Sequence, residues 1–287
     1  MQTILKSADQ SVIIGSDLPL IMIGEKINPT GRKKLAKALM DQDFDYIRQL
    51  VLDQAAWGAK VLDINVGVPG IDEKETIKKV IEFVSSISKL PLCLDSANVE
   101  VLEAGLTKAP GKVLINSVSG EEKRLKSILP LVKEYKTAVI GLTMDAAGIP
   151  QSPEERVDIA ERIITEAVKL GIPIEDVIID PLVLTVGSDS RAGLITLETI
   201  ALLKKALGIN INVGASNVSF GLPDRGIINQ AFLCLCIQAG ATCAITDPIK
   251  FGQTIKAADL LLGRDTNSIQ YLKYFRMVEK LKMDTKD

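Results

Sequence analysis

LPLCLDSAN, residues 90–98, is a short apolar run that ends on the carboxylate Asp95 and continues with small and polar residues. An apolar run of this length without alternation is typical of a strand buried on both faces. The pattern recurs five more times, each apolar run reaching a polar residue: KVLDIN (60–65), KVLINS (112–117), VIIDPL (177–182), NVGASN (212–217) and CAITD (243–247). The repetition predicts that these polar side chains share one site.

Strand and helix patterns alternate along the whole chain. Strands are predicted at 20–24, 60–67, 90–95, 112–117, 137–144, 176–182, 211–216 and 242–247. Helical patterns lie at 34–57, 72–88, 120–134, 153–170, 193–207, 225–240 and 252–263. The alternation predicts an α/β protein with a single (β/α)8 TIM barrel at about 20–263, within one domain that spans 1–287. An amphipathic C-terminal helix is expected at 265–282, packed on the barrel. A doubly wound sheet of eight strands is the alternative fold.

Composition excludes several classes of function. The net charge is −2 and no basic run is present, so we expect no nucleic-acid partner. No run of 18 apolar residues occurs, and the N-terminal stretch is interrupted by Lys6 and Asp9, so no membrane span or signal peptide is expected. The expected location is the cytoplasm. Hydrophobic residues make up 47% of the chain and aromatic residues 4%, which indicates an aliphatic core.

The chain contains no histidine, which removes imidazole bases, Ser-His-Asp triads and His-Cys zinc sites. The four cysteines are expected to be reduced, buried thiols: Cys93, Cys234, Cys236 and Cys243. No metal site is predicted.

In a barrel of this type the active site lies at the carboxyl ends of the strands. The candidate residues at these ends are Asp63, Asn65, Asp95, Asn116, Asp180, Asn217 and Asp247. Asp or Asn after a strand also caps helices, and Asn98 is expected to do so. For Asp63, Asp95, Asn116 or Asp180 alone, capping is an equally good interpretation, but all four at strand ends, together with Asn217, favour a shared site. Three carboxylates could hold Mg²⁺. The amides among them favour an organic ligand rich in hydrogen-bond donors, and a pterin ring fits this description.

Seven stretches of the sequence resemble the pterin-binding methyltransferases: IGEKIN (23–28), GAKVLDINVG (58–67), PLCLDSAN (91–98), LINS (114–117), GLTMDAAGIP (141–150), IDPL (179–182) and SNVSFGLPDR (216–225). The resemblance covers about 21–263. The most similar patterns are those of methyltetrahydrofolate:corrinoid protein methyltransferases and the folate domain of cobalamin-dependent methionine synthase. It implies methyl transfer between N5 of tetrahydrofolate and the cobalt of a corrinoid. Tetrahydrofolate or 5-methyltetrahydrofolate would be the substrate, a corrinoid protein carrying cobalamin would be the partner, and the enzyme would be a homodimer in one-carbon metabolism.

The resemblance also assigns roles to residues. Asp95, Asn116 and Asp180 would bind the pterin, with Asp63 and Asn65 lining the same pocket. Asn217 would lie near N5 as a mobile side chain, and Arg225 would lie near the benzoyl part of the folate. The catalytic residues would be Asn217, Asp95 and Asp180, which with water would deliver a proton to N5. Phe220 stands where the corrinoid/iron–sulfur branch is expected to have a polar residue, which leaves the corrinoid partner and the direction of transfer open.

Two alternative functions follow from the same residues. Dihydropteroate synthase shares the scaffold, and Arg32, Lys33 and Lys34 in INPTGRKK (27–34) could bind a diphosphate. The serine- and arginine-rich loops expected of that enzyme are missing. A non-catalytic folate-binding subunit is the other alternative, and the presence of Asn217 argues against it.

Overall fold

Eight parallel strands form a ring in the computed structural model, which describes residues 1–284. The strands are β3 (Ile21–Ile27), β4 (Val61–Ile64), β5 (Leu92–Asp95), β6 (Leu114–Ser119), β7 (Ala138–Leu142), β8 (Val177–Asp180), β9 (Asn212–Gly214) and β10 (Cys243–Thr246). The ring closes where Ile179 of β8 forms a parallel bridge with Ile211, beside β9. The amide of Ile179 donates to the carbonyl of Asn210 at 3.0 Å. The predicted barrel is therefore confirmed, and the open doubly wound sheet is excluded.

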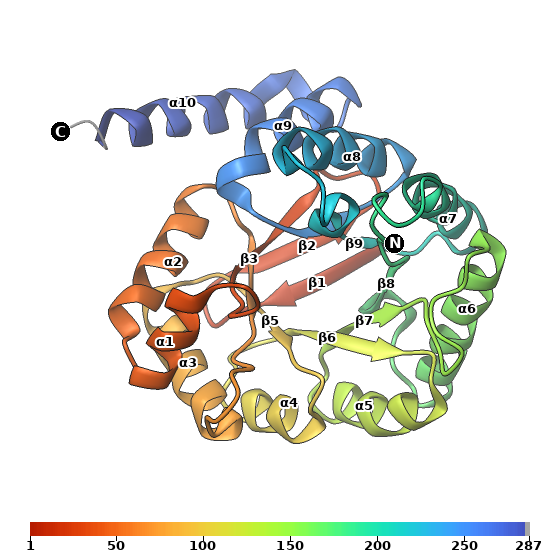
Figure 1. Cartoon of the computed structure of the whole chain (residues 1–287), viewed down its shortest axis with the longest axis horizontal. Helices are drawn as coiled ribbons and strands as arrows, with labels where there is room; N and C mark the ends of the chain where they lie inside the picture. Colours follow the sequence, from red (N-terminus) through yellow and green to blue (C-terminus); the bar gives the residue numbers. More distant parts are fainter. Residues whose placement is uncertain (285–287) are drawn as a thin grey trace.

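Helices surround this ring (Figure 1). They are α1 (Lys33–Asp41), α2 (Phe44–Ala56), α3 (Glu73–Ile87), α4 (Val99–Leu106), α5 (Glu122–Glu134), α6 (Pro153–Lys169), α7 (Ala192–Leu207), α8 (Arg225–Ala239), α9 (Pro248–Leu261) and α10 (Ile269–Asp284). Short 3₁₀ turns lie at η1 (Ile174–Asp176), η2 (Ala215–Ser219) and η3 (Thr266–Ser268). Within residues 1–284, no helix combines the length and apolarity needed to cross a membrane.

Three predictions about the helices around the barrel need correction. The single helix expected at 34–57 is two, because Gln42 adopts a left-handed conformation and Asp43 begins a new helix by accepting from the amides of Asp45 and Tyr46. Helix α4 was not predicted, although its expected cap, Asn98, accepts from the amide of Glu100. Helix α9 begins at Pro248 rather than at residue 252.

The C-terminal helix α10 packs on α9, as expected, and buries Tyr274 and Val278. It begins at Ile269 rather than residue 265, because Asp265 accepts from the amides of Gln270 and Tyr271. The four cysteines are free thiols. Three are buried as expected, whereas Cys234 on α8 is partly exposed.

The apolar core is divided by the barrel wall. The larger part lies between the outer faces of the strands and the helices. The smaller part fills the inside of the ring and includes Leu5, Val12 and Ile14 from an N-terminal hairpin. This hairpin, β1 (Gln2–Lys6) and β2 (Ser11–Gly15), is antiparallel and was not predicted. It crosses the centre of the ring in Figure 1 and covers the amino ends of the strands.

Candidate functional site

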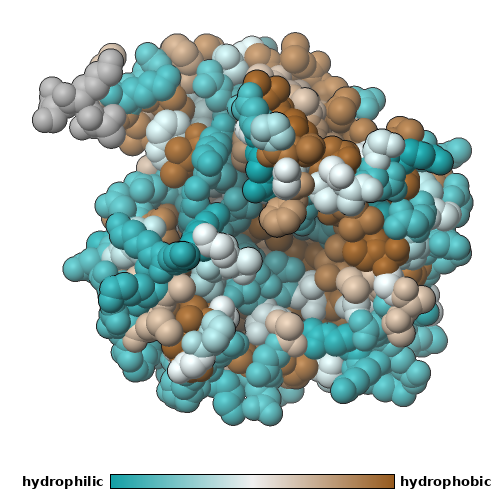
Figure 2. Space-filling model, in the orientation of Figure 1, coloured by the Kyte–Doolittle hydropathy of each residue, from teal (hydrophilic) through white to brown (hydrophobic). Residues whose placement is uncertain are grey.

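The carboxyl ends of the strands surround a cavity of about 370 Å³. Figure 2 shows the molecule hollowed at the centre of the ring. Each of the eight strands contributes one residue to its wall: Glu25, Asp63, Asp95, Asn116, Leu142, Asp180, Gly214 and Ile245. Alternate residues of a strand face the same side, so the residues two positions earlier form the layer below. That layer consists of Ile23, Val61, Cys93, Leu114, Ile140, Ile178, Asn212 and Cys243. The strands thus end in a polar layer that rests on a mostly apolar one.

Asp63 is the most deeply buried carboxylate of this wall, with 1% of its surface exposed. The side-chain amide of Asn116 donates to its Oδ1 at 3.3 Å, and the thiol of Cys93 bonds it from the layer below. Burial raises the pKa of Asp63 well above its usual range, and the nearby Asp95 raises it further. Asp63 is therefore harder to ionise than an exposed aspartate.

One carboxylate oxygen of Asp95 accepts hydrogen bonds from two side-chain amides. The Nδ2 atoms of Asn65 and Asn28 donate to its Oδ2 at 3.0 and 3.2 Å. Asn65 is fixed in turn, because its Oδ1 accepts from the amide of Gly67 at 2.7 Å. Burial raises the pKa of Asp95, and the bond from Asn65 lowers it. Asp95 also lines the cavity, where its carboxylate can accept a hydrogen bond from a ligand.

Asp180 is held by donors on both oxygens. The amide of Leu182 donates to Oδ1 at 2.8 Å, and the side-chain amide of Asn212 donates to Oδ2 at 2.7 Å. Burial raises its pKa to about 6, while these bonds act in the opposite direction. A carboxylate with this pKa is mostly ionised at neutral pH and accepts hydrogen bonds from a ligand.

Asn217 lies in η2 on the rim of the cavity, and its side chain is exposed. Arg225 does not line the cavity. Its Nη2 donates to the carbonyl of Ser216 at 2.7 Å and its Nε to the hydroxyl of Ser219 at 3.1 Å. The guanidinium also lies 5.6 Å from the ring of Phe220, which is 67% exposed. Arg225 therefore holds the turn that carries Asn217.

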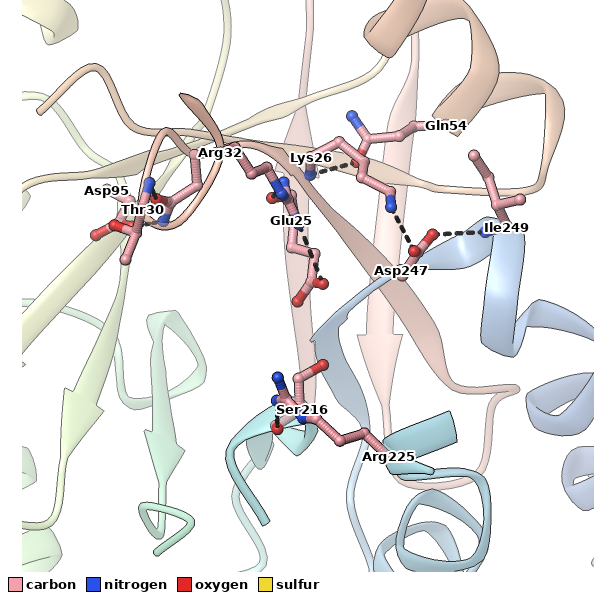
Figure 3. Close-up of polar contacts among 11 residues, drawn as sticks. Glu25, Lys26, Thr30, Arg32, Gln54, Asp95, Ser216, Arg225, Asp247 and Ile249 are labelled. Carbon is pink, nitrogen blue, oxygen red and sulfur yellow. Dashed lines mark hydrogen bonds and ion pairs between the residues drawn. The ribbon is translucent and has the colours of Figure 1, made fainter. Parts of the chain in front are cut away.

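The cavity brings together five of the predicted residues, Asp63, Asp95, Asn116, Asp180 and Asn217. Asn65 lies behind Asp95. Asp247, expected at the shared site, does not line the cavity: it caps α9 by accepting from the amide of Ile249 at 3.1 Å, and it pairs with Lys26 (Figure 3).

Three residues line the cavity without having been predicted as site residues: Glu25 from β3, and Asn28 and Thr30 from the first loop. Arg32, considered only as a diphosphate-binding residue, lines it too. Arg32 donates to the backbone oxygen of Glu25 at 2.7 Å, and its Nη2 lies 3.5 Å from the Glu25 carboxylate (Figure 3). Burial raises the pKa of Glu25, and Arg32 opposes that effect. Glu25 lies in mid-strand, so a search for polar residues at strand ends missed it.

The wall therefore carries four carboxyl groups and one guanidinium. Within residues 1–284, no group of three or more His, Cys, Asp or Glu side chains is arranged to hold a metal ion. An acceptor-rich cavity of this kind suits a flat ligand with several N–H donors.

Known structures share this fold. Dihydropteroate synthase from Xanthomonas albilineans, in complex with indole-2-carboxylic acid and 6-chloroguanine, superposes with a TM-score of 0.67 at 23% identity, covering 93% of this chain and 100% of that one. The enzyme from Yersinia pestis gives 0.67 at 15% identity, covering 92% and 100%. At these identities the likeness concerns the fold.

Sequence relatives are more similar. A methylcorrinoid:tetrahydrofolate methyltransferase from Eubacterium limosum is 34% identical over 264 residues, which are 90% of this chain and 96% of the relative. Methionine synthase from Mycobacterium tuberculosis is 33% identical over 84% of this chain, which corresponds to 21% of that larger protein. The family model described as pterin binding enzyme matches residues 24–247, the segment that contains the whole cavity wall. This chain therefore belongs to the pterin binding enzyme family.

Proposed function

We propose that this protein transfers a methyl group between N5 of tetrahydrofolate and the cobalt of a corrinoid. The observation that carries the proposal is the convergence of Asp95, Asn116, Asp180 and Asn217 on one cavity. Its support from sequence is the 34% identity, over nearly the whole length of both chains, to a methylcorrinoid:tetrahydrofolate methyltransferase.

The cavity wall suits the pterin ring. Asp180 and Asp95 accept hydrogen bonds from its ring and exocyclic N–H groups, and each bond to an ionised carboxylate contributes about 1.5–3 kcal/mol. Asn116 donates a hydrogen bond from its Nδ2 to Asp63, and its Oδ1 is the atom proposed to accept from the ligand. Asp63 thus positions Asn116 from the neighbouring part of the wall.

Methyl transfer from N5 requires that the nitrogen be protonated or strongly hydrogen-bonded, because without a proton it would have to leave as an anion, which is a poor leaving group. The chain contains no histidine, so the proton must come from another group. Burial raises the pKa of the carboxyl groups of Asp63, Asp95 and Asp180, so these groups, together with water, are the candidates to supply the proton. Asn217 relays or donates a hydrogen bond to N5 as charge changes there.

The corrinoid supplies the cobalt that gives or accepts the methyl group. We propose that a separate corrinoid protein presents it over the mouth of the cavity, where Asn217 lies on the rim. By the same resemblance we propose that the protein works in the cytoplasm as a homodimer and that residues 1–287 form one domain. We also propose that Asn65 supports the binding of the pterin and that Arg225 supports the binding of the benzoyl part of the folate.

The decisive experiment mixes the purified protein with methylcobalamin and tetrahydrofolate, and follows the corrinoid absorbance together with the formation of 5-methyltetrahydrofolate. We expect both changes at matched rates, and the reverse reaction from cob(I)alamin and 5-methyltetrahydrofolate. A parallel incubation with pterin diphosphate and aminobenzoate tests dihydropteroate synthesis. Dihydropteroate formation, or folate binding without methyl transfer, would contradict the proposal.

A further inference from the structure

One polar side chain interrupts the apolar layer beneath the cavity. Seven of the eight residues in that layer are aliphatic or cysteine, and the eighth is Asn212, which has no exposed surface. A buried carboxamide costs free energy unless all its hydrogen-bonding atoms find partners. Asn212 therefore needs a structural or functional reason, and its partners indicate one.

Asn212 lies between two groups on the neighbouring strands. Its Nδ2 donates to Oδ2 of Asp180 on β8 at 2.7 Å. Its Oδ1 accepts from the thiol of Cys243 on β10, with the sulfur 3.6 Å away. The thiol is neutral because burial raises its pKa well above the usual value. This donor sets the orientation of the amide: rotation by half a turn would place the amide oxygen against the Asp180 carboxylate and leave the thiol facing an N–H group.

We propose that Asn212 is a positioning residue, which holds Asp180 as an ionised acceptor aimed into the cavity. The inference rests on the proposed folate site. Asn212 itself does not line the cavity, so its effect on a ligand passes through Asp180. The short bond to Oδ2, with the amide of Leu182 on Oδ1, fixes the plane of the carboxylate and stabilises its charge.

The titratable groups packed against Asp180 from the elements around it include Arg156 on α6, whose charge favours the ionised carboxylate, and the thiols of Cys236 on α8 and Cys243 on β10. Within the cavity, the wall also carries the carboxyl groups of Glu25, Asp63 and Asp95 and the guanidinium of Arg32. Both thiols are neutral because burial raises their pKa. Arg156 donates to the carbonyls of Pro181 and Leu182 rather than to the Asp180 side chain. Asn212 is thus the side chain that donates directly to this carboxylate.

The test compares pH profiles. The affinity of the wild type for 5-methyltetrahydrofolate is measured by calorimetry from pH 5 to 8.5. The midpoint is the pH at which half of this affinity has been lost as the pH is lowered. In Asn212→Leu, loss of a hydrogen bond to a charged group should move that midpoint upward by about one to two pH units. Affinity at pH 7 then falls about two- to tenfold, and most of it is recovered at pH 8.5. Protonation of the ligand itself contributes equally in the wild type and in every variant, so it does not affect the comparison of their midpoints.

Asn210→Leu is the matched control. Asn210 is equally buried but donates to Thr3 and the carbonyl of Ile14 at the closed end of the barrel. Its loss should lower stability without moving the midpoint. Asn212→Asp keeps the shape of the side chain and should raise the midpoint if Asn212→Leu does not fold.

An NMR titration of the Asp180 carboxyl carbon in the unliganded protein measures the midpoint of Asp180 ionisation directly, without folate. A wild type that binds no reduced folate would contradict the proposed function, while the NMR shift in Asn212→Leu still tests the role of Asn212. An unchanged midpoint in both Asn212 variants, or an equal shift in Asn210→Leu, would overturn the inference.

Discussion

At the scale of single residues, Asp63 makes the stability of the protein depend on pH. Its pKa is raised in the folded state by burial and by Asp95. The folded protein therefore binds a proton that the unfolded chain has already released, and stability falls as pH rises from about 4 toward the folded pKa. One such group changes the free energy of unfolding by up to about 1.4 kcal/mol per pH unit.

We therefore expect Asp63→Asn to lose less stability than the wild type when pH is raised from 5 to 7. The asparagine cannot ionise, so folding no longer depends on holding that proton. Urea denaturation at the two pH values measures the difference. An identical loss in both proteins would mean that Asp63 titrates normally in the folded state.

Asn217 is expected to affect rate more than affinity. Asn217→Ala should slow methyl transfer about 10- to 1000-fold, because a donor that strengthens as charge develops at N5 is lost. Asn116→Ala and Asp180→Asn should chiefly weaken folate binding. Single-turnover rates and calorimetric affinities separate these effects, and equal losses of affinity in all three variants would contradict the division of roles.

Much of the cavity wall was predictable from the sequence, because Asp63, Asp95, Asn116 and Asp180 follow apolar strand runs and share a face by simple alternation. Asn212 was not, since its partners come from two other strands and only the closed ring brings them together. Asp247 has the same local pattern as the wall residues but caps a helix instead.

At the scale of secondary-structure elements, Asn98 shows how capping and binding residues separate. It follows Asp95 by three positions, yet its side chain caps α4. We expect Asn98→Ala to lower the free energy of unfolding by about 1 kcal/mol and to leave folate affinity unchanged. Asn98→Ser, which retains a capping oxygen, should restore most of the stability. A large loss of folate affinity in Asn98→Ala would instead place this residue in the site.

The helix boundaries were less predictable than the strands. Periodicity continues from α1 into α2, so the break at Gln42 and the new cap at Asp43 are hidden in the apolar pattern of 34–57. Helix α4 has only 8 residues, too few to show a clear period. Strand positions were found because buried parallel strands are short, nearly continuous apolar runs.

At the scale of the whole molecule, the N-terminal hairpin completes the core of the barrel. Leu5 is fully buried among the inward-facing residues of the strands, whereas its neighbour Ile4 is 39% exposed. We expect Leu5→Ala to lower the free energy of unfolding by about 2–5 kcal/mol, because it leaves a cavity in a close-packed interior. Ile4→Ala is the control and should cost much less. Similar losses in denaturation experiments would show that the hairpin does not depend on its buried face.

The hairpin also has a kinetic consequence. Among residues 1–284, Leu5, Val12 and Ile14 fill the amino end of the ring, so a molecule bound at the carboxyl ends of the strands enters and leaves through the mouth of the cavity. A large second reactant bound at the mouth of the cavity would prevent the first one from leaving. Binding would then be ordered, with the smaller reactant binding first. Its product would dissociate only after the larger reactant had dissociated.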